Sequence, residues 1–491
     1  MIKVLFLASE MEPLAKTGGL ADVIGVLPKK LKEIGCDTRV ILPYYREVKK
    51  NLRQLKLKVK NVSKEVLVSI DWLAYKGTIK ETNVEGVTVY LLCNDEFYDR
   101  DALYTTPNGD YQDNDLRFGF YSLGALEVAK ALNFKPDIIH CNDWQSAMAP
   151  IALRWKKHYN NDPFFNESKI VFTIHNIAYQ GIYKPDLLDK FGLSHSLFNT
   201  EHLEFYGRIN LLKGGIITSD LITTVSPTYA KEIRTREYGY GLDGVLRATS
   251  DEGKLVGILN GIDYDDWDPE RDKDLFYNFS SEDLEGKHRS KSKLKSVLGF
   301  EANGHKPLIG VISRLALQKG VDLVVRSLNS ILDLDVDLVV LGKGDKKYEK
   351  LLRDVSADYR GNFKAIIGYD EAKARRIYAG CDMFLMPSRF EPCGLGQLIS
   401  LRYGTIPIVR ATGGLIDTII DYNENEVYGN GFVFKHFSER DMVDSIERAL
   451  NVYKNRGEWT NLIKTGMRMD YSWKKSSKVY LRHYKALLGR N

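Results

Sequence analysis

Short runs of β-branched and other apolar residues alternate with longer amphipathic stretches along almost the whole chain. Such a chain can bury both kinds of segment as parallel strands with helices on both faces of the sheet. Strands are expected at Ile2–Leu7, 38–42, 66–70, 87–92, 137–140, 170–173 and 221–225, and then at Leu308–Ile312, 337–341, Phe363–Ile367, Met383–Met386 and 405–409. Helical patterns lie between several of them, for example at 116–132 and 321–332.

The alternation occurs twice, with a break in rhythm near residues 255–267. A chain of 491 residues is long enough for two or more domains. We therefore predict an α/β protein with two doubly wound, Rossmann-like domains at 1–254 and 255–471, followed by a C-terminal helix at 472–491. The polar segment 264–296 is expected to be an extended connector. In such folds a ligand binds at the carboxyl ends of the strands, here in the cleft between the domains.

Composition excludes several classes of protein. The net charge of +5 is too small to indicate a nucleic-acid partner, and no apolar run is long enough to span a membrane. The five cysteines are scattered and form no CxxC pair, so we expect free thiols in a reducing compartment. No signal peptide is evident, which predicts a cytoplasmic protein. A mature plastid protein without its transit peptide remains an alternative, and the oligomeric state is not indicated.

The run KTGGL at 16–20 lies between the first expected strand and a helical pattern at 20–31. A glycine loop at a helix N-terminus offers backbone N–H groups to an anion, and Gly18 and Gly19 let a ligand approach closely. Lys16 adds a point charge. The alternative is that the two glycines only make the turn.

Two cations follow the strand expected at Leu308–Ile312, namely Arg314 and Lys319. Arg can bind phosphate with two hydrogen bonds, and Lys provides a mobile charge, so this loop is a candidate for an anionic ligand. A solvated loop with incidental charges is the alternative.

The loop 387–397 follows the strand expected at Met383–Met386 and precedes a second helical pattern. Its glycines offer further backbone donors, and Glu391 could accept from sugar hydroxyls or face a positive reacting carbon. A helix-capping carboxylate is the alternative. In the first half, His175 and Asp143 each follow an expected strand. For each of them a structural role is the alternative to a functional one.

Five motifs occur together: KTGGL at 16–20, TIHNIAYQG at 173–181, LNGID at 259–263, the run at 313–320 and RFEPCGL at 389–395. With them the chain resembles the bacterial glycogen synthase and plant starch synthase family over nearly its whole length, and RFEPCGL is the most specific motif. The resemblance implies a GT-B fold, in which two Rossmann-like domains face a central cleft and the C-terminal helix crosses back to the first domain. It also implies transfer of glucose from ADP-glucose, or less often UDP-glucose, to the non-reducing end of an α-1,4-glucan with retention.

The resemblance also implies roles for single residues. The donor-binding residues that it implies are Lys16, Gly18, Gly19, Arg314, Lys319, Tyr369, Glu391, Cys393, Gly394 and Leu395. In this reading Arg314 and Lys319 stabilise the departing diphosphate, and Tyr369 stacks on the adenine. The catalytic residues that it implies are Glu391, His175, Arg314 and Lys319. The residues on the sugar and acceptor side are Tyr98, Asp143, Asn176 and Asn260. No metal ion and no cofactor is expected.

The chain departs from the family pattern at a few positions. Asn142 and Gln145 stand where many bacterial members carry His. Ile399 stands where the broader GT-B pattern has a second glutamate, which this family commonly lacks. Ala21 replaces a frequent Gly, and Gly396 stands where Thr is common. None of these changes removes a candidate for the chemistry.

Other functions remain open at this stage. A related glycosyltransferase could use UDP-glucose or another acceptor, and a phosphorylase would need a lysine that binds pyridoxal phosphate. A protein of another class would be a catalytically silent scaffold that binds glucan. The intact set of Lys16, Arg314, Lys319 and Glu391 argues against a scaffold, since a scaffold has no need of a diphosphate clamp.

Overall fold

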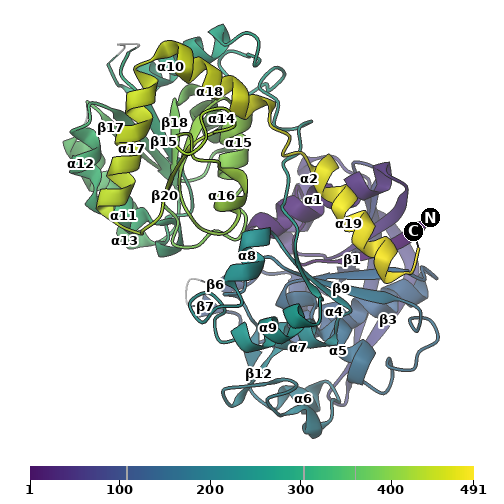
Figure 1. The fold of residues 1–491 in the computed structure, drawn as a ribbon. Coiled ribbons are helices and arrows are strands. Elements are labelled where there is room, and N and C mark those ends of the chain that lie inside the picture. Colours follow the sequence, from purple (N-terminus) through teal and green to yellow (C-terminus); the bar gives the residue numbers. More distant parts are fainter. Residues whose placement is uncertain (107–108, 302–304, 360, 491) are drawn as a thin grey trace. The chain divides into compact units, whose positions relative to one another are not determined.

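The structure is a computed structural model that describes residues 1–106, 109–301, 305–359 and 361–490. It divides into two compact units. The first consists of Met1–Val225, Ala230–Ile258 and Trp473–Asn491, and the second of Ser226–Tyr229 and Leu259–Ser472. Each unit has its own sheet and its own helices (Figure 1).

The first unit is built on a nine-stranded sheet in the order β14-β13-β9-β8-β1-β2-β5-β4-β3. Its strands are β1 (Ile2–Leu7), β2 (Cys36–Pro43), β3 (Lys60–Ile70), β4 (Leu73–Val84), β5 (Val87–Cys93), β8 (Ile138–Asn142), β9 (Lys169–Ile174), β13 (Leu221–Thr224) and β14 (Leu255–Gly257). The strands from β14 to β5 are parallel, as the alternation predicts. β3 and β4 instead form an antiparallel hairpin on β5. Buried and exposed residues alternate in much of this hairpin, as is typical of a sheet with one face in water.

The helices of the first unit are α1 (Gly19–Glu33), α2 (Arg46–Gln54), α3 (Asp95–Tyr98), α4 (Asn114–Ala131), α5 (Met148–Trp155), α6 (Leu187–Lys190), α7 (Leu211–Thr218), α9 (Asp243–Asp251) and α19 (Trp473–Leu487), with α8 (Pro227–Glu232) at the boundary between units. α4 is buried on nearly all sides. The C-terminal helix α19 lies beside α1 (Figure 1). Its Tyr484 hydroxyl lies 2.6 Å from Nδ1 of His140, which ties the last helix to the central sheet.

The second unit is built on a six-stranded parallel sheet in the order β17-β16-β15-β18-β19-β20. Its strands are β15 (Leu308–Ile312), β16 (Asp337–Gly342), β17 (Phe363–Ile367), β18 (Met383–Met386), β19 (Ile406–Arg410) and β20 (Phe432–Phe434). Its helices are α10 (Glu285–Leu298), α11 (Val321–Arg326), α12 (Leu328–Leu332), α13 (Lys346–Asp358), α14 (Glu371–Gly380), α15 (Gly396–Arg402), α16 (Gly413–Thr418), α17 (Glu439–Tyr453) and α18 (Arg456–Arg468). This is the strand order of a Rossmann fold.

Each sheet reverses its strand order at one point, and these points position the candidate site. In the second unit the order reverses between β15 and β18, whose following loops carry the predicted residues at 313–320 and 387–397. In the first unit it reverses between β1 and β8, which are followed by the glycine loop and by Asp143. Ligands of doubly wound sheets bind at such reversals.

The expected connector at 264–296 contains a helix, because α10 begins at Glu285. Its sequence looks solvated, but Lys287, Lys291 and Lys295 lie one turn apart and are buried. Lys287 bonds to three backbone carbonyls and to the hydroxyl of Thr405, while Lys291 pairs with Asp382. Buried lysines are rare unless paired. The sequence pattern therefore indicated an exposed segment, although one face of this helix is buried.

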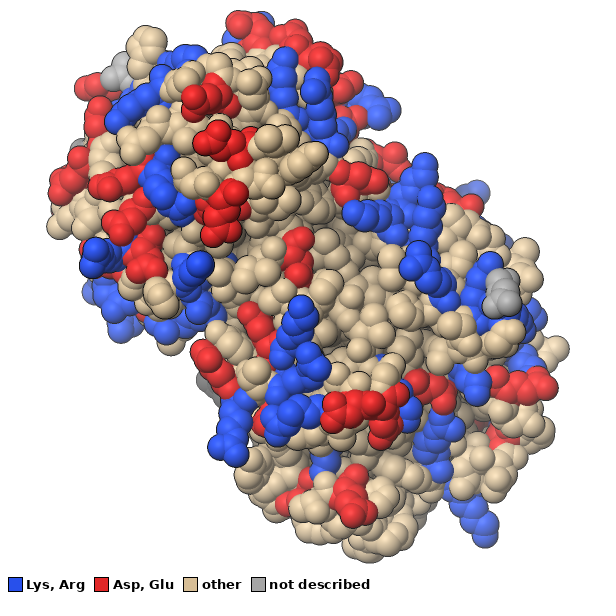
Figure 2. Space-filling view, in the orientation of Figure 1, with Lys and Arg blue, Asp and Glu red and all other residues tan. Residues whose placement is uncertain are grey.

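Charged residues of both signs are mixed over the face of each unit that Figure 2 shows. The excess of Lys and Arg therefore forms no single-sign field on this face. Among the described residues, no helix is both long and apolar enough to cross a membrane.

Candidate active site

The glycine loop of the first unit already holds an anion, the carboxylate of Glu10. Its Oε2 accepts the N–H groups of Thr17 at 2.5 Å and Gly18 at 3.1 Å, and its Oε1 accepts the hydroxyls of Thr17 and Tyr104. Glu10 is only 4% exposed, so this carboxylate is buried and held by four donors. The Gly18 N–H, which the sequence predicted for the donor, is therefore engaged within the chain.

Open donors remain one residue further on, at the start of α1. Within the described residues, the N–H groups of Gly19 and Leu20 make no hydrogen bond. A Cβ atom built on Gly18 or Gly19 would meet no atom within 4 Å, and neither glycine has a positive φ. The fold itself does not require these glycines, which favours a ligand that approaches the backbone here. The Nζ atom of Lys16 lies nearby in the sequence and pairs with Asp22 at 2.7 Å.

Asp143 holds the backbone of the second predicted stretch in this unit. Its Oδ1 accepts the N–H of His175 at 2.8 Å, and its carboxylate also accepts the N–H of Asn176. Burial raises the pKa of Asp143 to about 7, although these two hydrogen bonds lower it. Its φ of 54° is unusual for a residue other than glycine and indicates a functional constraint. The structure thus brings Asp143, His175 and Asn176 together. Their role on the sugar side stays a prediction.

Asn142 fixes the ring of His175, a function that the sequence reasoning missed. The Asn142 amide nitrogen donates to the carbonyls of Leu7 and His140, so its Oδ1 faces Nε2 of His175 at 2.9 Å. We assign the proton to Nε2 on this geometry, which leaves Nδ1 as an acceptor. Burial lowers the pKa of His175 to about 3, so the imidazole is neutral at pH 7.

Tyr98 is not brought to these groups. Its side chain is fully buried, its hydroxyl donates to the carbonyl of Arg117, and its ring packs edge-on against Tyr45. A role for Tyr98 in sugar binding stays a prediction.

In the second unit, the residues predicted for the two charges of the reaction form an ion pair. The Nζ atom of Lys319 lies 2.5 Å from Oε2 of Glu391, which also accepts the hydroxyl of Ser388 at 3.0 Å. The Glu391 side chain is 6% exposed and the Lys319 side chain 19%. Arg314 is exposed and reaches Gln318 within its own loop.

The loops after β15 and β18 are held together through Gln318 and Gly320. The Arg389 N–H donates to the Gln318 carbonyl at 2.8 Å. Gly320 has a φ of 70°, and a Cβ atom on it would lie 2.0 Å from the Pro387 carbonyl oxygen. Only glycine fits this approach, which sets the distance between Lys319 and Glu391.

The remainder of the RFEPCGL stretch leads into α15. Cys393 is buried, and burial raises the pKa of its thiol to about 12, so the thiol is a packing group at neutral pH. The N–H groups of Gly394 and Leu395 bond to no other group within the described residues. Gly396, which departs from the family's Thr, has no room for a side chain, since a Cβ atom would lie 2.9 Å from Cε1 of Phe384.

Two other predicted residues of this unit remain, one exposed and one buried. The ring of Tyr369 is 66% exposed at the end of β17. Asn260 is 5% exposed, and its Oδ1 atom has no partner within the described residues. A buried unpaired oxygen is costly, so it is a candidate contact for a ligand hydroxyl.

A second TGGL run, at 412–415, supports the Glu391 loop. Gly413 has a φ of 46°, and a Cβ atom on it would lie 2.0 Å from the Glu391 carbonyl oxygen. The Gly414 N–H donates to the same carbonyl at 3.1 Å. The repeat of four letters was visible in the sequence, but its contact with Glu391 was not.

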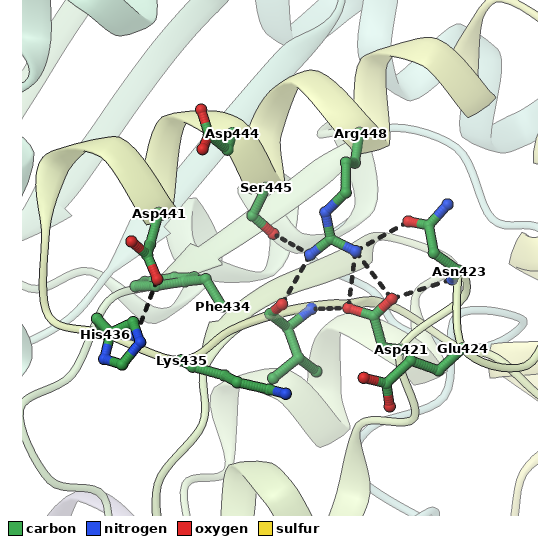
Figure 3. A pocket seen from close by; sticks show the side chains of 11 residues that line it. Asp421, Asn423, Glu424, Phe434, Lys435, His436, Asp441, Asp444, Ser445 and Arg448 are labelled. Atoms are coloured by element: carbon green, nitrogen blue, oxygen red, sulfur yellow. Dashed lines mark hydrogen bonds and ion pairs between the residues drawn. The ribbon is translucent and has the colours of Figure 1, made fainter.

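A pocket of about 390 Å³ lies elsewhere in the second unit, beside β20 and α17 (Figure 3). Arg448 occupies its centre and bonds to Asp421, Asn423, Ser445 and the carbonyl of Val433. None of the predicted site residues lines this pocket. Because Arg448 is engaged by these groups, it is a structural link between β20 and α17.

Comparison with known proteins agrees with this arrangement. Residues 3–248 match the family model described as starch synthase catalytic domain, and residues 298–465 match the model described as glycosyl transferases group 1. The chain is 45% identical to a glycogen synthase of Geotalea uraniireducens over 489 residues, which cover 100% of this chain and 99% of the relative. It is 46% identical to glycogen synthase 2 of Geobacter metallireducens, with 99% and 98% covered.

A solved structure resembles the whole chain. It is the catalytic domain of starch synthase IV from Arabidopsis thaliana bound to ADP and acarbose, with a TM-score of 0.91, 36% identity and full coverage of both chains. The two Rossmann-like units and these matches define a retaining glycosyltransferase of the GT-B fold class. Within that class, the chain belongs to the glycogen synthase and starch synthase family, whose function it shares.

Proposed function

We propose that the protein transfers glucose from ADP-glucose to the non-reducing end of an α-1,4-glucan, with retention, and releases ADP. The observation that carries this proposal is the grouping of Arg314, Lys319 and Glu391 on two loops at the strand reversal of the second unit. Two cations and a carboxylate there match the opposite charges that develop on a departing diphosphate and on an anomeric carbon.

In the second unit the negative charge would be met by Arg314, Lys319 and the open N–H groups of Gly394 and Leu395. In the first unit, Lys16 and the open N–H groups of Gly19 and Leu20 offer the same chemistry. Arg314 is exposed and can turn its guanidinium toward a diphosphate. Preorganised donors of this kind often contribute the largest catalytic effect. The proposal assigns no step to a metal ion or a cofactor.

The positive charge on the sugar would be met by Glu391. Retaining hydrolases use a second carboxylate as nucleophile about 5 Å from the acid. The position of the second acid in the broader pattern is Ile399 here, which is buried in the core. We therefore favour transfer on one face of the sugar. The bond from the anomeric carbon to the phosphate oxygen breaks, the bond to the acceptor oxygen forms, and the acceptor proton passes to the departing phosphate.

Asp143, His175 and Asn176 would bind the sugar. The neutral His175 offers Nδ1 as an acceptor for a hydroxyl, and Asp143 fixes the backbone that carries it. The exposed ring of Tyr369 would stack on the base of the donor, and such a ring accepts adenine or uracil. The starch synthase neighbour with bound ADP favours adenine.

The five cysteines are unpaired and buried. Free thiols fit a reducing compartment, and we propose the cytoplasm as the place of action.

The test is glucose incorporation into glycogen from ADP-glucose and from UDP-glucose at equal concentration. Arg314→Ala should lower incorporation from ADP-glucose by about 10²–10³-fold, because one cationic donor to the departing diphosphate is lost. Arg440→Ala is the matched control, since Arg440 is 89% exposed and pairs with Asp444 on the same helix, α17.

Each outcome decides one part of the proposal. Incorporation from UDP-glucose alone would keep the reaction and overturn the donor. No incorporation from either donor, with glucan still bound, would favour the scaffold. Equal loss in Arg314→Ala and Arg440→Ala would remove Arg314 from the clamp.

A further inference from the structure

Two tyrosines of the first unit occupy left-handed turns. Tyr206 and Gly207 connect β11 to β12 with φ of 49° and 77°, and Tyr240 and Gly241 repeat the pattern with 49° and 83°. The strands are β11 (Glu204–Phe205) and β12 (Arg208–Asn210). β12 lies between β11 and β10 (Ile182–Tyr183) and pairs with both. The first of two such positions ordinarily holds Asn, Asp or Gly, because a large side chain is strained there.

The two turns lie against each other. A Cβ atom built on Gly241 would lie 2.9 Å from Cζ of Phe205 and 3.3 Å from Cε2 of Tyr206. The rings nevertheless face solvent, since Tyr206 is 82% exposed and Tyr240 is 45% exposed. The Tyr206 ring meets the Phe205 ring edge-on with centroids 4.7 Å apart, but most of its surface faces solvent and adds little to folding.

A third exposed ring belongs to the same place. Tyr179 is 52% exposed, and its phenol is close enough to Tyr240 to add to the rise that burial causes in the pKa of Tyr240. Gln180 donates to the carbonyl of Tyr240 at 3.1 Å and accepts from the amide of Asn210 at 2.7 Å. We call Tyr179, Tyr206 and Tyr240 the tyrosine platform.

The platform is continuous with the predicted sugar side. Tyr179 lies three residues after Asn176, on the loop that Asp143 holds. A Cβ atom on Gly181 would lie 2.5 Å from Cε3 of Trp144, so this loop packs on the residue next to Asp143. Through Tyr179, the tyrosine platform therefore adjoins the loop that carries the predicted sugar-side residue Asn176.

We propose that the tyrosine platform binds an α-glucan chain, through glucose units of the acceptor beyond its reacting end. This inference rests on the proposed function, which makes that glucan the acceptor. Pyranose rings offer apolar C–H faces to aromatic rings, and the phenol hydroxyls can bond to sugar hydroxyls. Backbone strain is retained at functional sites when the surrounding structure holds it, and here two of the three exposed rings, those of Tyr206 and Tyr240, lie on strained backbone.

The left-handed turns allow a sharp test. Tyr206→Asn and Tyr240→Asn remove the rings but suit the turns, so the melting temperature should stay the same or rise. Each ring removed should weaken the affinity for amylose by about twofold to tenfold. In the double variant, KM for glycogen should rise accordingly, while KM for ADP-glucose and kcat with maltotriose stay unchanged.

Matched variants separate the ring from other effects. Tyr206→Phe with Tyr240→Phe keeps the stacking faces and should keep most of the affinity. Trp72→Ala removes a 90% exposed ring between β3 and β4, outside the platform, and should change nothing.

Affinity electrophoresis in amylose gels reads binding without activity. If the double Asn variant is folded and its amylose affinity is unchanged, the proposal that the platform binds glucan is wrong. Binding of a protein partner at these rings would not support the proposal. If the wild type binds amylose through these rings but transfers no glucose, the proposed function fails and the platform stands. If glucose transfer is normal and removing the rings leaves the amylose affinity unchanged, only the platform proposal is wrong.

Discussion

Lys319 and Glu391, which are 72 residues apart in the chain, are joined by an ion pair of 2.5 Å in the second unit. In the proposed reaction the first meets the leaving phosphate and the second the sugar ring. Without a donor, each neutralises the other, and Ser388 supports the carboxylate. A bound diphosphate would also pair with Lys319.

Removing either partner should leave the other uncompensated. Lys319→Gln and Glu391→Gln should each lower the free energy of unfolding by about 1.5–3 kcal/mol, because a hydrogen bond to a charged group is lost. The double variant should lose less than the sum of the two. Urea unfolding of the four proteins measures this coupling.

A control for that cycle is Lys346→Gln, which removes an ion pair whose lysine side chain is 86% exposed. Its effect should stay below about 1 kcal/mol. Strictly additive losses in the double variant would contradict a direct interaction between Lys319 and Glu391. Turnover should fall by about 10²–10³-fold in both single variants.

The carboxylate of Glu10 should control amide exchange in the first glycine loop. Without ligand, the N–H groups of Thr17 and Gly18 should exchange slowly, because Glu10 accepts both. Those of Gly19 and Leu20 should exchange fast and gain protection only when ADP is added. Glu10→Ala should expose the first pair, and amide-resolved hydrogen exchange measures both effects. Protection of Gly19 without ADP would contradict the assignment.

The two TGGL runs should respond differently to the same substitution. Gly413→Ala should lower the free energy of unfolding by about 2–4 kcal/mol, because its φ is 46° and a Cβ atom would meet the Glu391 carbonyl. Gly19→Ala meets nothing within 4 Å and should keep stability or add up to about 1 kcal/mol. Its KM for ADP-glucose should rise by about 5- to 100-fold if phosphate approaches there. Thermal unfolding and donor titration measure the contrast, and an unchanged KM would make Gly19 a simple turn residue.

His140 should make the protein more stable as the pH rises from about 3 to 6.5. Burial, and then the neighbouring His175, lower the pKa of His140 to about 3. Between these values the unfolded chain binds a proton that the folded chain does not. Stability from this group is therefore complete above pH 6.5 and is lost as the pH falls toward 3, by about 1.4 kcal/mol per pH unit.

His140→Gln should remove the contribution of His140 to the slope of the free energy of unfolding against pH, as measured by urea unfolding between pH 4 and 7. Burial also lowers the pKa of His175 to about 3, so His175 should still contribute to this slope in the variant. Tyr484→Phe is the control, since it removes the hydroxyl that meets His140 and keeps the imidazole. It should lower stability by about 1–3 kcal/mol at every pH and leave the slope intact. An unchanged slope in His140→Gln would contradict a neutral buried imidazole.

Most strands, the α/β class and the motifs were readable from the sequence, but β4 and its antiparallel hairpin with β3 were not predicted. β1, β15, β17 and β18 match their predicted bounds at both ends. Each is a short run rich in apolar residues, which is a signal that the local sequence carries. The family and its glycosyltransferase function were also readable, since RFEPCGL and the other motifs need no tertiary information to be recognised.

The tertiary structure alone decided which groups face one another. His140 and Tyr484 are 344 residues apart, and the lysine face of α10 is satisfied by carbonyls more than 90 residues away. The first glycine loop was predicted to bind the donor, but Glu10 accepts the N–H of Thr17 there. The contact between the two Tyr-Gly turns depends on long-range packing and could not be predicted from the sequence. A periodic pattern records whether a side chain is apolar, but the partner of a buried charge or a strained ring is fixed by long-range packing.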